Sequence, residues 1–224
     1  MITDKYKMSQ KENILYAKRN IIDYIYNSAK LEGLKVTFPQ TQAIYNKLKI
    51  DNTSVDFDEV NKILNLKHAW QYIIKNIDKE INLGFISRVH EEVAKDEALE
   101  WGKIRTGQVS ISGTYYIPPI PQKKDVEEQL SIFNKDTNIT NRAIDRMLYM
   151  MKSQIFWDGN KRTATIIANK DLICNGAGII SVKETDLYNF NILLTNFYND
   201  DRNKNELKNF LYEKSIDGMS TKKI

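Results

Sequence analysis

The amino-acid sequence predicts an all-α, mainly helical protein that carries one small β-hairpin. Proline and glycine are scarce, 4 and 9 among 224 residues, and they cluster at few places, which is typical of long helices with few breaks. Between these places, apolar residues recur at helical spacing. Hydrophobic residues make up 42% of the chain, which is enough to form the core of a single domain of this length.

Four helices are predicted in the first half of the chain. Apolar positions at helical spacing over residues 9–31 indicate the first, and Gly33 follows as its stop signal. Pro39 opens the second, because proline is favoured in the first turn of a helix. Residues 56–76 carry a third apolar stripe, and a fourth helix over residues 82–94 begins at an asparagine, a favourable N-cap.

The strand-like segment of the chain spans residues 108–117. Val109 and Ile111 precede a Ser-Gly turn signal at 112–113, and a pair of tyrosines follows that signal. A group of three prolines then ends the segment, so we expect a short β-hairpin here. After it, helical spacing predicts helices over residues 122–134, 139–153, 160–175, 184–199 and 204–213.

These elements predict one structural unit with three parts. Residues 1–50 would form an N-terminal helical region, and residues 51–217 would form the core domain. Residues 218–224 are polar and follow the last predicted helix, so we expect a flexible tail there.

Composition and charge exclude several classes of protein. Basic residues outnumber acidic ones by 33 to 29 and the two signs are well mixed, so the net charge of +4 predicts no nucleic-acid partner. No run approaches 18 apolar residues and the N-terminus resembles no signal peptide, so we expect no membrane partner and a cytoplasmic protein. One cysteine cannot form an internal disulfide, and with two distant histidines it cannot build a zinc site of the usual kind.

Residues 154–164, between two predicted helices, concentrate the side chains suited to chemistry. An Asp-Gly pair at 158–159 predicts a sharp turn, and residues 160–162, Asn-Lys-Arg, enter the next helix. Unpaired N–H groups at a helix start, together with two cations, suit an anion such as phosphate. Asp158 offers a hard oxygen ligand that suits Mg²⁺ shared with a polyphosphate. The alternative is an ordinary capped turn with a solvated lysine and arginine.

This segment resembles the signature of the Fic/Doc family, His-x-Phe-x-(Asp/Glu)-Gly-Asn-(Gly/Lys)-Arg, and its ending is similar to the Doc-like version. Two further blocks match in the right order. Residues 102–113, with the prolines at 118–119, resemble the family's flap hairpin, and residues 28–33 fit the inhibitory motif (Ser/Thr)-x-x-x-Glu-(Gly/Asn). The resemblance covers about residues 20–215, and the three ordered blocks are far more specific than any one of them.

The resemblance implies a Fic fold, a helical bundle with a β-hairpin flap, over the core domain. It also implies transfer of AMP from ATP to a hydroxyl group of a target protein, with Mg²⁺. Asp158 would hold the metal. The residues that would bind the nucleotide are Gly159, Asn160, Lys161 and Arg162.

The two outer blocks carry further expectations from the same resemblance. In the N-terminal helix, Ser28, Glu32 and Gly33 would form the inhibitory motif, and members with such a helix can be homodimers. An unknown target protein would dock by strand addition along the flap residues Val109, Ser110, Ile111 and Ser112.

Gln154 stands at the position of the family's catalytic histidine. A glutamine amide does not titrate near neutral pH and cannot act as a general base, a loss that typically costs about 10²–10⁴-fold in rate. His68 and His90 lie in other predicted helices, where a capping or core role is favoured over a catalytic one.

Thr165 stands where many members carry a second arginine that pairs with the inhibitory glutamate. Two interpretations of the N-terminal motif follow. Either Glu32 meets Arg162 instead, or the motif only closes a helix at Gly33.

The sequence therefore predicts a Fic-type protein adenylyltransferase whose transfer is impaired by the missing histidine. The first alternative is a nucleotide-binding pseudoenzyme that docks a target on the flap without modifying it. Weaker alternatives are a de-AMPylase, in which Glu32 orients a water, and a Doc-like kinase. A helical scaffold without a ligand is the remaining alternative.

Overall fold

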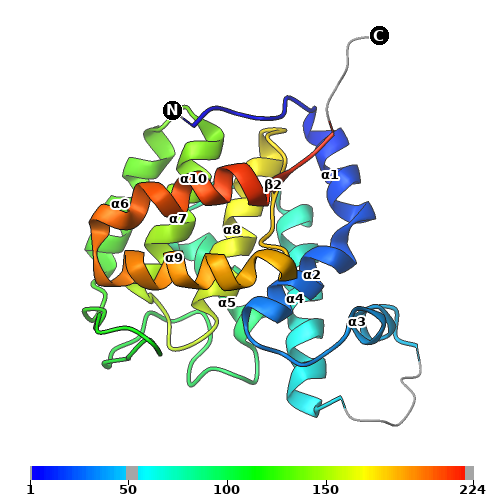
Figure 1. Ribbon diagram of the computed structural model, residues 1–224, viewed down its shortest axis with the longest axis horizontal. Coiled ribbons are helices and arrows are strands. Elements are labelled where there is room, and N and C mark those ends of the chain that lie inside the picture. Colours follow the sequence, from blue (N-terminus) through cyan, green and yellow to red (C-terminus); the bar gives the residue numbers. More distant parts are fainter. Residues whose placement is uncertain (1, 49–54, 220–224) are drawn as a thin grey trace.

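Helices dominate the part of the chain that the computed structural model describes, residues 2–48 and 55–219 (Figure 1). A two-stranded antiparallel sheet pairs Ile179 with Asp217 and Ile180 with Ile216. The elements are α1 (Gln10–Arg19), α2 (Ile21–Leu31), α3 (Phe38–Tyr45), α4 (Phe57–Lys75), α5 (Leu83–Ala94), α6 (Lys123–Lys135), α7 (Ile139–Ser153), α8 (Asn160–Cys174), β1 (Ile179–Ile180), the 3₁₀ turn η1 (Glu184–Asp186), α9 (Leu187–Asn199), the 3₁₀ turn η2 (Asp201–Asn203), α10 (Lys204–Ser215) and β2 (Ile216–Asp217).

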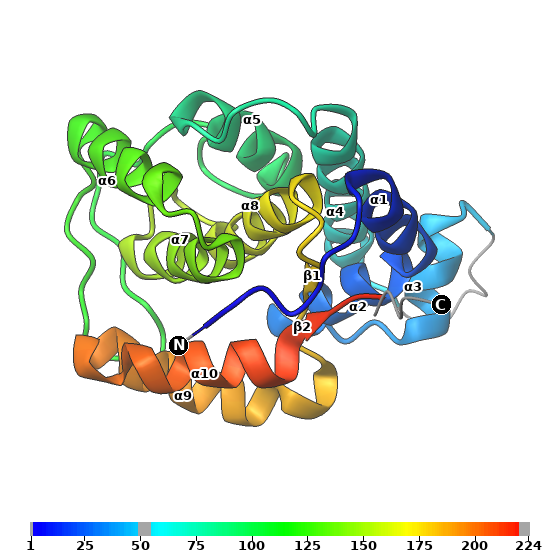
Figure 2. The ribbon, with the colours of Figure 1, turned by 90° about the horizontal axis from the view of Figure 1, so that it is seen from above.

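The helices pack in layers around α7 and α8, which lie side by side. Seen from above, α5 and α6 lie on one side of this pair, and α9 and α10 lie on the other (Figure 2). Because neighbours enclose α8, it lacks a polar face, and even Lys170 and Asp171 are buried in it. Arg142 and Arg146 of α7 reach Asp171 at 2.7 and 2.5 Å, so the buried carboxylate is paired.

Most predicted helix boundaries are confirmed, because local caps set them. Asp56 and Asn82 cap α4 and α5 through their side chains, and α7 spans the predicted residues 139–153. The single helix expected over residues 9–31 is wrong, since the chain breaks at Asn20. There the asparagine side chain donates to the Tyr16 carbonyl at 2.9 Å and competes with the helical hydrogen bonds.

The small sheet was expected in the flap but forms elsewhere, between β1 and β2. Residues 108–117 contain no strand and form an irregular loop with a turn in which Thr114 N–H donates to the Ile111 carbonyl. The returning leg cannot complete a ladder at 118–119, because proline has no N–H. Instead the buried Arg105 side chain bridges the two legs, donating to the carbonyls of Gly107 and Pro119 at 2.6 Å each.

Each of the three predicted parts of the chain has an end that falls outside the described residues. The boundary at 50/51 lies within residues 49–54, and the predicted tail lies mostly within residues 220–224. Residues of α2 and α8 belong to one continuous apolar core. In the described ranges no helix is both long and apolar enough to cross a membrane.

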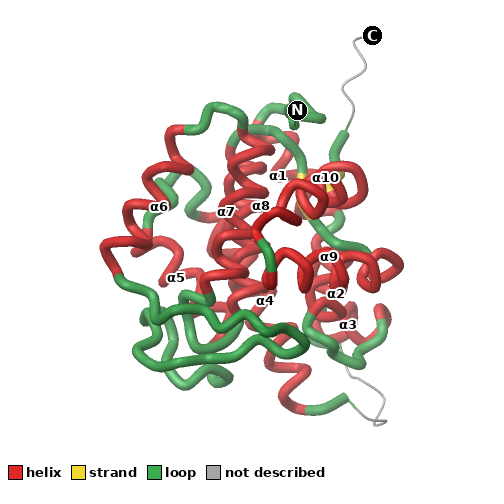
Figure 3. Tube along the Cα trace, turned by 60° about the vertical axis from the view of Figure 1, so that its left-hand side comes forward, coloured by secondary structure: helices red, strands yellow, loops and turns green. Residues whose placement is uncertain are grey.

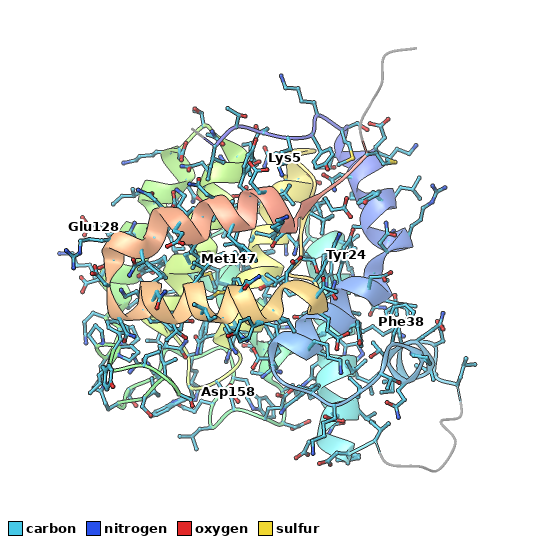
Figure 4. The ribbon with its side chains drawn as sticks, viewed as in Figure 1. Lys5, Tyr24, Phe38, Glu128, Met147 and Asp158 are labelled. Carbon is cyan, nitrogen blue, oxygen red and sulfur yellow. The ribbon has the colours of Figure 1, made fainter. Side chains whose placement is uncertain are left out.

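Long loops gather at one end of the molecule, as the tube view shows (Figure 3). Figure 4 places Asp158 at this end, below the ends of the central helices. The flap and the loop between α7 and α8 therefore meet at the end of the bundle where α8 begins.

Candidate functional site

The turn that joins α7 to α8 has two residues in the left-handed region. Gln154, the C-cap of α7, has φ 45°, and Gly159, the N-cap of α8, has φ 70°. A Cβ at Gly159 would lie 3.3 Å from Val93 Cγ1 and 3.4 Å from Ala94 Cβ. Glycine therefore lets the start of α8 approach the end of α5 closely.

Asn160 holds this turn together from inside. Its Oδ1 accepts from the Phe156 N–H at 2.9 Å, and its Nδ2 donates to the Phe156 carbonyl at 2.8 Å and to Gln154 Oε1 at 3.1 Å. Because both the amide oxygen and the amide nitrogen are engaged, the Asn160 side chain has no donor left for a ligand.

The N-terminus of α8 has no side-chain cap. Asp158 Oδ1 accepts from the Gly159 N–H at 2.6 Å, which leaves the following N–H groups of the first turn free for a ligand. These groups carry the positive end of the helix dipole, so the place suits an anion.

Arg162, one turn further on, is buried among carboxylates. Its Nη1 donates to Glu97 Oε2 at 2.8 Å, its Nε lies 4.0 Å from Glu32 Oε1, and its Nη2 lies 4.0 Å from Asp158 Oδ1. Burial alone would lower the pKa of Arg162, but the charges of Glu32, Glu97 and Asp158 outweigh it and the pKa is raised. Arg162 therefore remains a cation beside the uncapped helix end.

Glu32 approaches the same place from the end of α2. Its Oε1 lies 3.8 Å from Lys161 Nζ, and that ammonium also donates to the Leu31 carbonyl at 3.2 Å. Gly33 ends α2 with φ 77°, as the sequence predicts, and Ser28 lies buried in the last turns of this helix. Of the two interpretations left open by Thr165, the geometry matches the one in which Glu32 meets Arg162.

Gln154 has no free amide group for chemistry. Its Nε2 donates to the Met151 carbonyl at 2.6 Å, and its Oε1 accepts from Asn160. The Gln154 carbonyl accepts from Arg105 Nε at 2.5 Å. The side chain at the histidine position therefore stabilises the turn.

The two histidines differ in environment. His68 is exposed on α4, so the core or capping role expected for it is wrong. His90 is buried in α5, as expected, and stacks on Phe156 with ring centroids 3.9 Å apart. Its Nδ1 accepts from the Gly102 N–H at 2.9 Å, so Nε2 carries the proton and donates to the Asp158 carbonyl at 2.8 Å. Burial lowers the pKa of His90 to about 4, so the ring is neutral at pH 7.

The flap residues lie at the surface of the same end of the molecule. Ser110 and Ser112 are exposed, and Val109 and Ile111 are half-buried. The N–H groups of residues 109–112 make no hydrogen bond within the described chain. Asn199 of α9 tethers the flap beyond its turn, because its Oδ1 accepts from the Tyr115 N–H at 3.0 Å.

Two residues of this site received no role from the sequence. Arg105 donates to carbonyls of the flap and of the α7 end, and its one signal was a place inside the flap-like block. Glu97 lies in a charged stretch that is typical of solvated surface, so no sequence pattern indicated its ion pair with Arg162. In α9, the buried Tyr198 hydroxyl has no hydrogen-bond partner among the described residues, and burial together with the Glu32 charge raises its pKa.

Asp158 is the residue to which the sequence analysis assigns a metal. Its side chain is 59% exposed. The described residues contain no group of three or more His, Cys, Asp or Glu that could hold a metal ion by themselves. A single carboxylate fits Mg²⁺ that arrives with a polyphosphate, because Mg²⁺ keeps most of its ligands as water and phosphate oxygens.

Comparisons with known proteins point to one family. The sequence model of the Fic/DOC family matches residues 80–172, which include the turn and most of α8. The protein adenylyltransferase Fic of Nematostella vectensis is 27% identical over 185 residues, which cover 77% of this chain and 42% of that protein. The protein of the same name from Drosophila willistoni is 28% identical over 168 residues, which cover 71% of this chain and 33% of the relative. The chain thus spans about two fifths or less of the length of these relatives.

Solved structures show the same fold. A Fic domain containing signaling protein from Bacteroides thetaiotaomicron superposes with a TM-score of 0.73 at 15% identity, covering 95% of this chain and 94% of that one. Fic-1 (residues 134–508) from C. elegans superposes with a TM-score of 0.70 at 23% identity, covering 88% of this chain and 61% of that one. The chain therefore has the fold of Fic-family proteins, and its residues 80–172 match the sequence model of that family.

Proposed function

We propose that the protein is a Fic-type protein adenylyltransferase that binds ATP at the start of α8 and transfers AMP slowly to a hydroxyl group of a target protein. One observation supports this most. The start of α8 is uncapped and lies beside the cations Lys161 and Arg162, an arrangement that suits phosphate, whereas Gln154, at the position of the base, is bonded inside the turn. The relatives named protein adenylyltransferase support the reaction type.

The phosphates would lie against the first turn of α8. The free N–H groups after Gly159 would donate to phosphate oxygens, and Arg162 and Lys161 would supply positive charge. Asp158 would hold Mg²⁺, which supplies a Lewis acid that offsets charge on the phosphates. The target segment would add as a strand along residues 109–112, whose N–H groups are free.

The rate would be limited by the proton of the target hydroxyl. Gln154 cannot accept it, and its amide is already bonded to Met151 and Asn160. Positioning of the hydroxyl by the flap would provide the remaining acceleration, with a phosphate oxygen or water taking the proton. We therefore expect transfer about 10²–10⁴-fold slower than with a histidine at this position.

Binding is tested first, by titrating the protein with ATP and Mg²⁺ in a calorimeter, with GTP, CTP and UTP as controls. Selective binding that depends on Mg²⁺ supports the proposal, and Asp158→Ala should remove the Mg²⁺ dependence. Absence of binding, both in the natural protein and in Glu32→Gly, would contradict it.

Transfer is tested next with ATP labelled at the α-phosphate and a mixture of proteins as acceptors. Gln154→His should raise incorporation of label by orders of magnitude, and Gln154→Asn is the matched control that adds no base. An inert Gln154→His protein that still binds ATP would contradict the transferase proposal.

That outcome would favour a second candidate, a nucleotide-binding module that docks a target without modifying it. The bonds of the Gln154 amide inside the turn are the observation that favours it, because they give residue 154 a structural role. The flap would then serve as a docking edge alone.

A further inference from the structure

The guanidinium group of Arg162 has one side anchored by hydrogen bonds and one side, Nε and Nη2, that makes no hydrogen bond within the described residues. Nη1 donates to Glu97 Oε2 at 2.8 Å and to the Val93 carbonyl at 3.4 Å. Nε has no hydrogen-bond partner, although Arg162 is only 1% exposed. Nη2 lies 4.0 Å from Asp158 Oδ1 and makes no hydrogen bond in the described chain.

The side without hydrogen bonds, formed by Nε and Nη2, faces the uncapped start of α8. Nη2 lies 3.6 Å from the position that a Cβ at Gly159 would take, and Nε lies 4.0 Å from Glu32 Oε1. The Nε and Nη2 hydrogens of an arginine form a fork that matches two oxygens of one phosphate. A buried donor without an acceptor is rare in folded proteins, so this edge indicates a ligand.

Glu97 is itself held in place from α4. Its Oε1 accepts from Asn65 Nδ2 at 2.9 Å, and the same Nδ2 donates to the Lys95 carbonyl at 2.7 Å. The Glu97 side chain is 8% exposed and Asn65 is 7% exposed. A buried chain of contacts therefore runs from Asn65 through Glu97 to Arg162.

We propose that Glu97, held by Asn65, is a positioning residue that fixes Arg162 so that its Nε and Nη2 edge receives a phosphate of the nucleotide. The proposal rests on the proposed function, because the phosphate belongs to the ATP that the site would bind. The negative charge of Glu97 repels a phosphate, so any benefit to binding comes from geometry. Removing the charge of Glu97 is therefore expected to strengthen ATP binding. Removing its hold on Arg162 is expected to weaken ATP binding.

Two variants of Glu97 separate the effects, with ATP affinity measured by calorimetry. Glu97→Gln removes the charge but keeps an acceptor for Nη1, so affinity is retained or improved. Glu97→Ala removes the acceptor as well, so ATP binds about tenfold or more weakly than to Glu97→Gln. Glu92→Ala, in α5 five residues before Glu97 and paired with Arg88, is the matched control and leaves affinity unchanged. Equal or tighter binding by Glu97→Ala than by Glu97→Gln would overturn the proposal.

A measurement without nucleotide keeps the two proposals distinguishable. NMR of the Arg162 side chain should show restricted rotation about the Cζ–Nη1 bond in the natural protein and in Glu97→Gln, but free rotation in Glu97→Ala. Equal rotation in all three would overturn the positioning role whether or not ATP binds. Restricted rotation with no ATP binding by the natural protein or by Glu32→Gly would instead contradict the proposed function alone.

Discussion

The side-chain amides of Gln154 and Asn160 bond to each other across the turn that joins α7 to α8, with Asn160 Nδ2 3.1 Å from Gln154 Oε1. This contact links the end of α7 to the uncapped start of α8, where the proposed phosphate site lies. Gln154, whose amide does not titrate, thus contributes a bond that keeps the turn in shape.

Replacement of Asn160 by alanine should destabilise the protein by about 2 kcal/mol, because it leaves the buried N–H and carbonyl of Phe156 without partners. Chemical denaturation measures the change in the free energy of unfolding. Asn191→Ala, at an exposed position of α9, is the control and should change it by less than about 0.5 kcal/mol. Equal stability of the two variants would show that the turn holds without Asn160.

The sequence predicts the local parts of this site because they depend on residues close together in the chain. The cap at Asn82 and the stop at Gly33 each involve a few neighbouring residues, and both are observed. The approach of Glu32 to Arg162 could be anticipated through the family resemblance, since local patterns do not report contacts between distant residues.

The features that the sequence missed depend on distant contacts. β1 and β2 have two residues each, too few for an alternating pattern, and they pair across 36 positions of the chain. In the flap, alternating residues predicted strands, but Arg105 takes the carbonyls that a ladder would use. The ion pair of Glu97 with Arg162 spans 65 positions and carries no local signal.

Glu32→Gln should tighten ATP binding by about tenfold, because it removes a negative charge beside the phosphate site. At this place three carboxylates (Glu32, Glu97 and Asp158) lie around two cations (Arg162 and Lys161), which leaves one excess negative charge. Removing one carboxylate charge, or binding Mg²⁺, offsets this excess. Calorimetry with Mg²⁺ and ATP measures the effect. Glu206→Gln, on the exposed face of α10, is the charge-matched control. If both variants bind ATP like the natural protein, the Glu32 carboxylate does not act on the phosphates.

His90 should make the protein less stable as the pH falls from about 6.5 to about 4. Its pKa in the folded state is lowered to about 4 by burial, so the unfolded chain binds the proton first and stability is lost across this window. The loss reaches about 3 kcal/mol at the acid end, since each pKa unit corresponds to about 1.4 kcal/mol. Denaturation curves at several pH values measure it.

His90→Gln removes the titrating group and should flatten that part of the pH profile. His68→Gln changes an exposed histidine and should leave the profile as it is. If the stability of His90→Gln falls with pH as steeply as that of the natural protein, other groups cause the loss of stability in acid.

Arg105→Met should loosen the flap, because the guanidinium is the group that joins its two legs to the end of α7. Arg105 donates to the carbonyls of Gly107 and Pro119 and, through Nε, to Gln154. Chymotrypsin cleavage after Tyr115, whose side chain is 96% exposed, should become about tenfold faster or more, because cleavage follows local opening.

Arg105→Lys separates the shape of the group from its charge. A single ammonium cannot reach both legs at once, so this variant should also be cleaved faster, although it keeps the positive charge. Arg202→Met, at an exposed arginine on η2, is the control and should be cleaved like the natural protein. If Arg105→Lys resists cleavage as the natural protein does, charge alone holds the loop. If it is cleaved like Arg105→Met, the planar fork is what replaces the missing β-ladder of the flap.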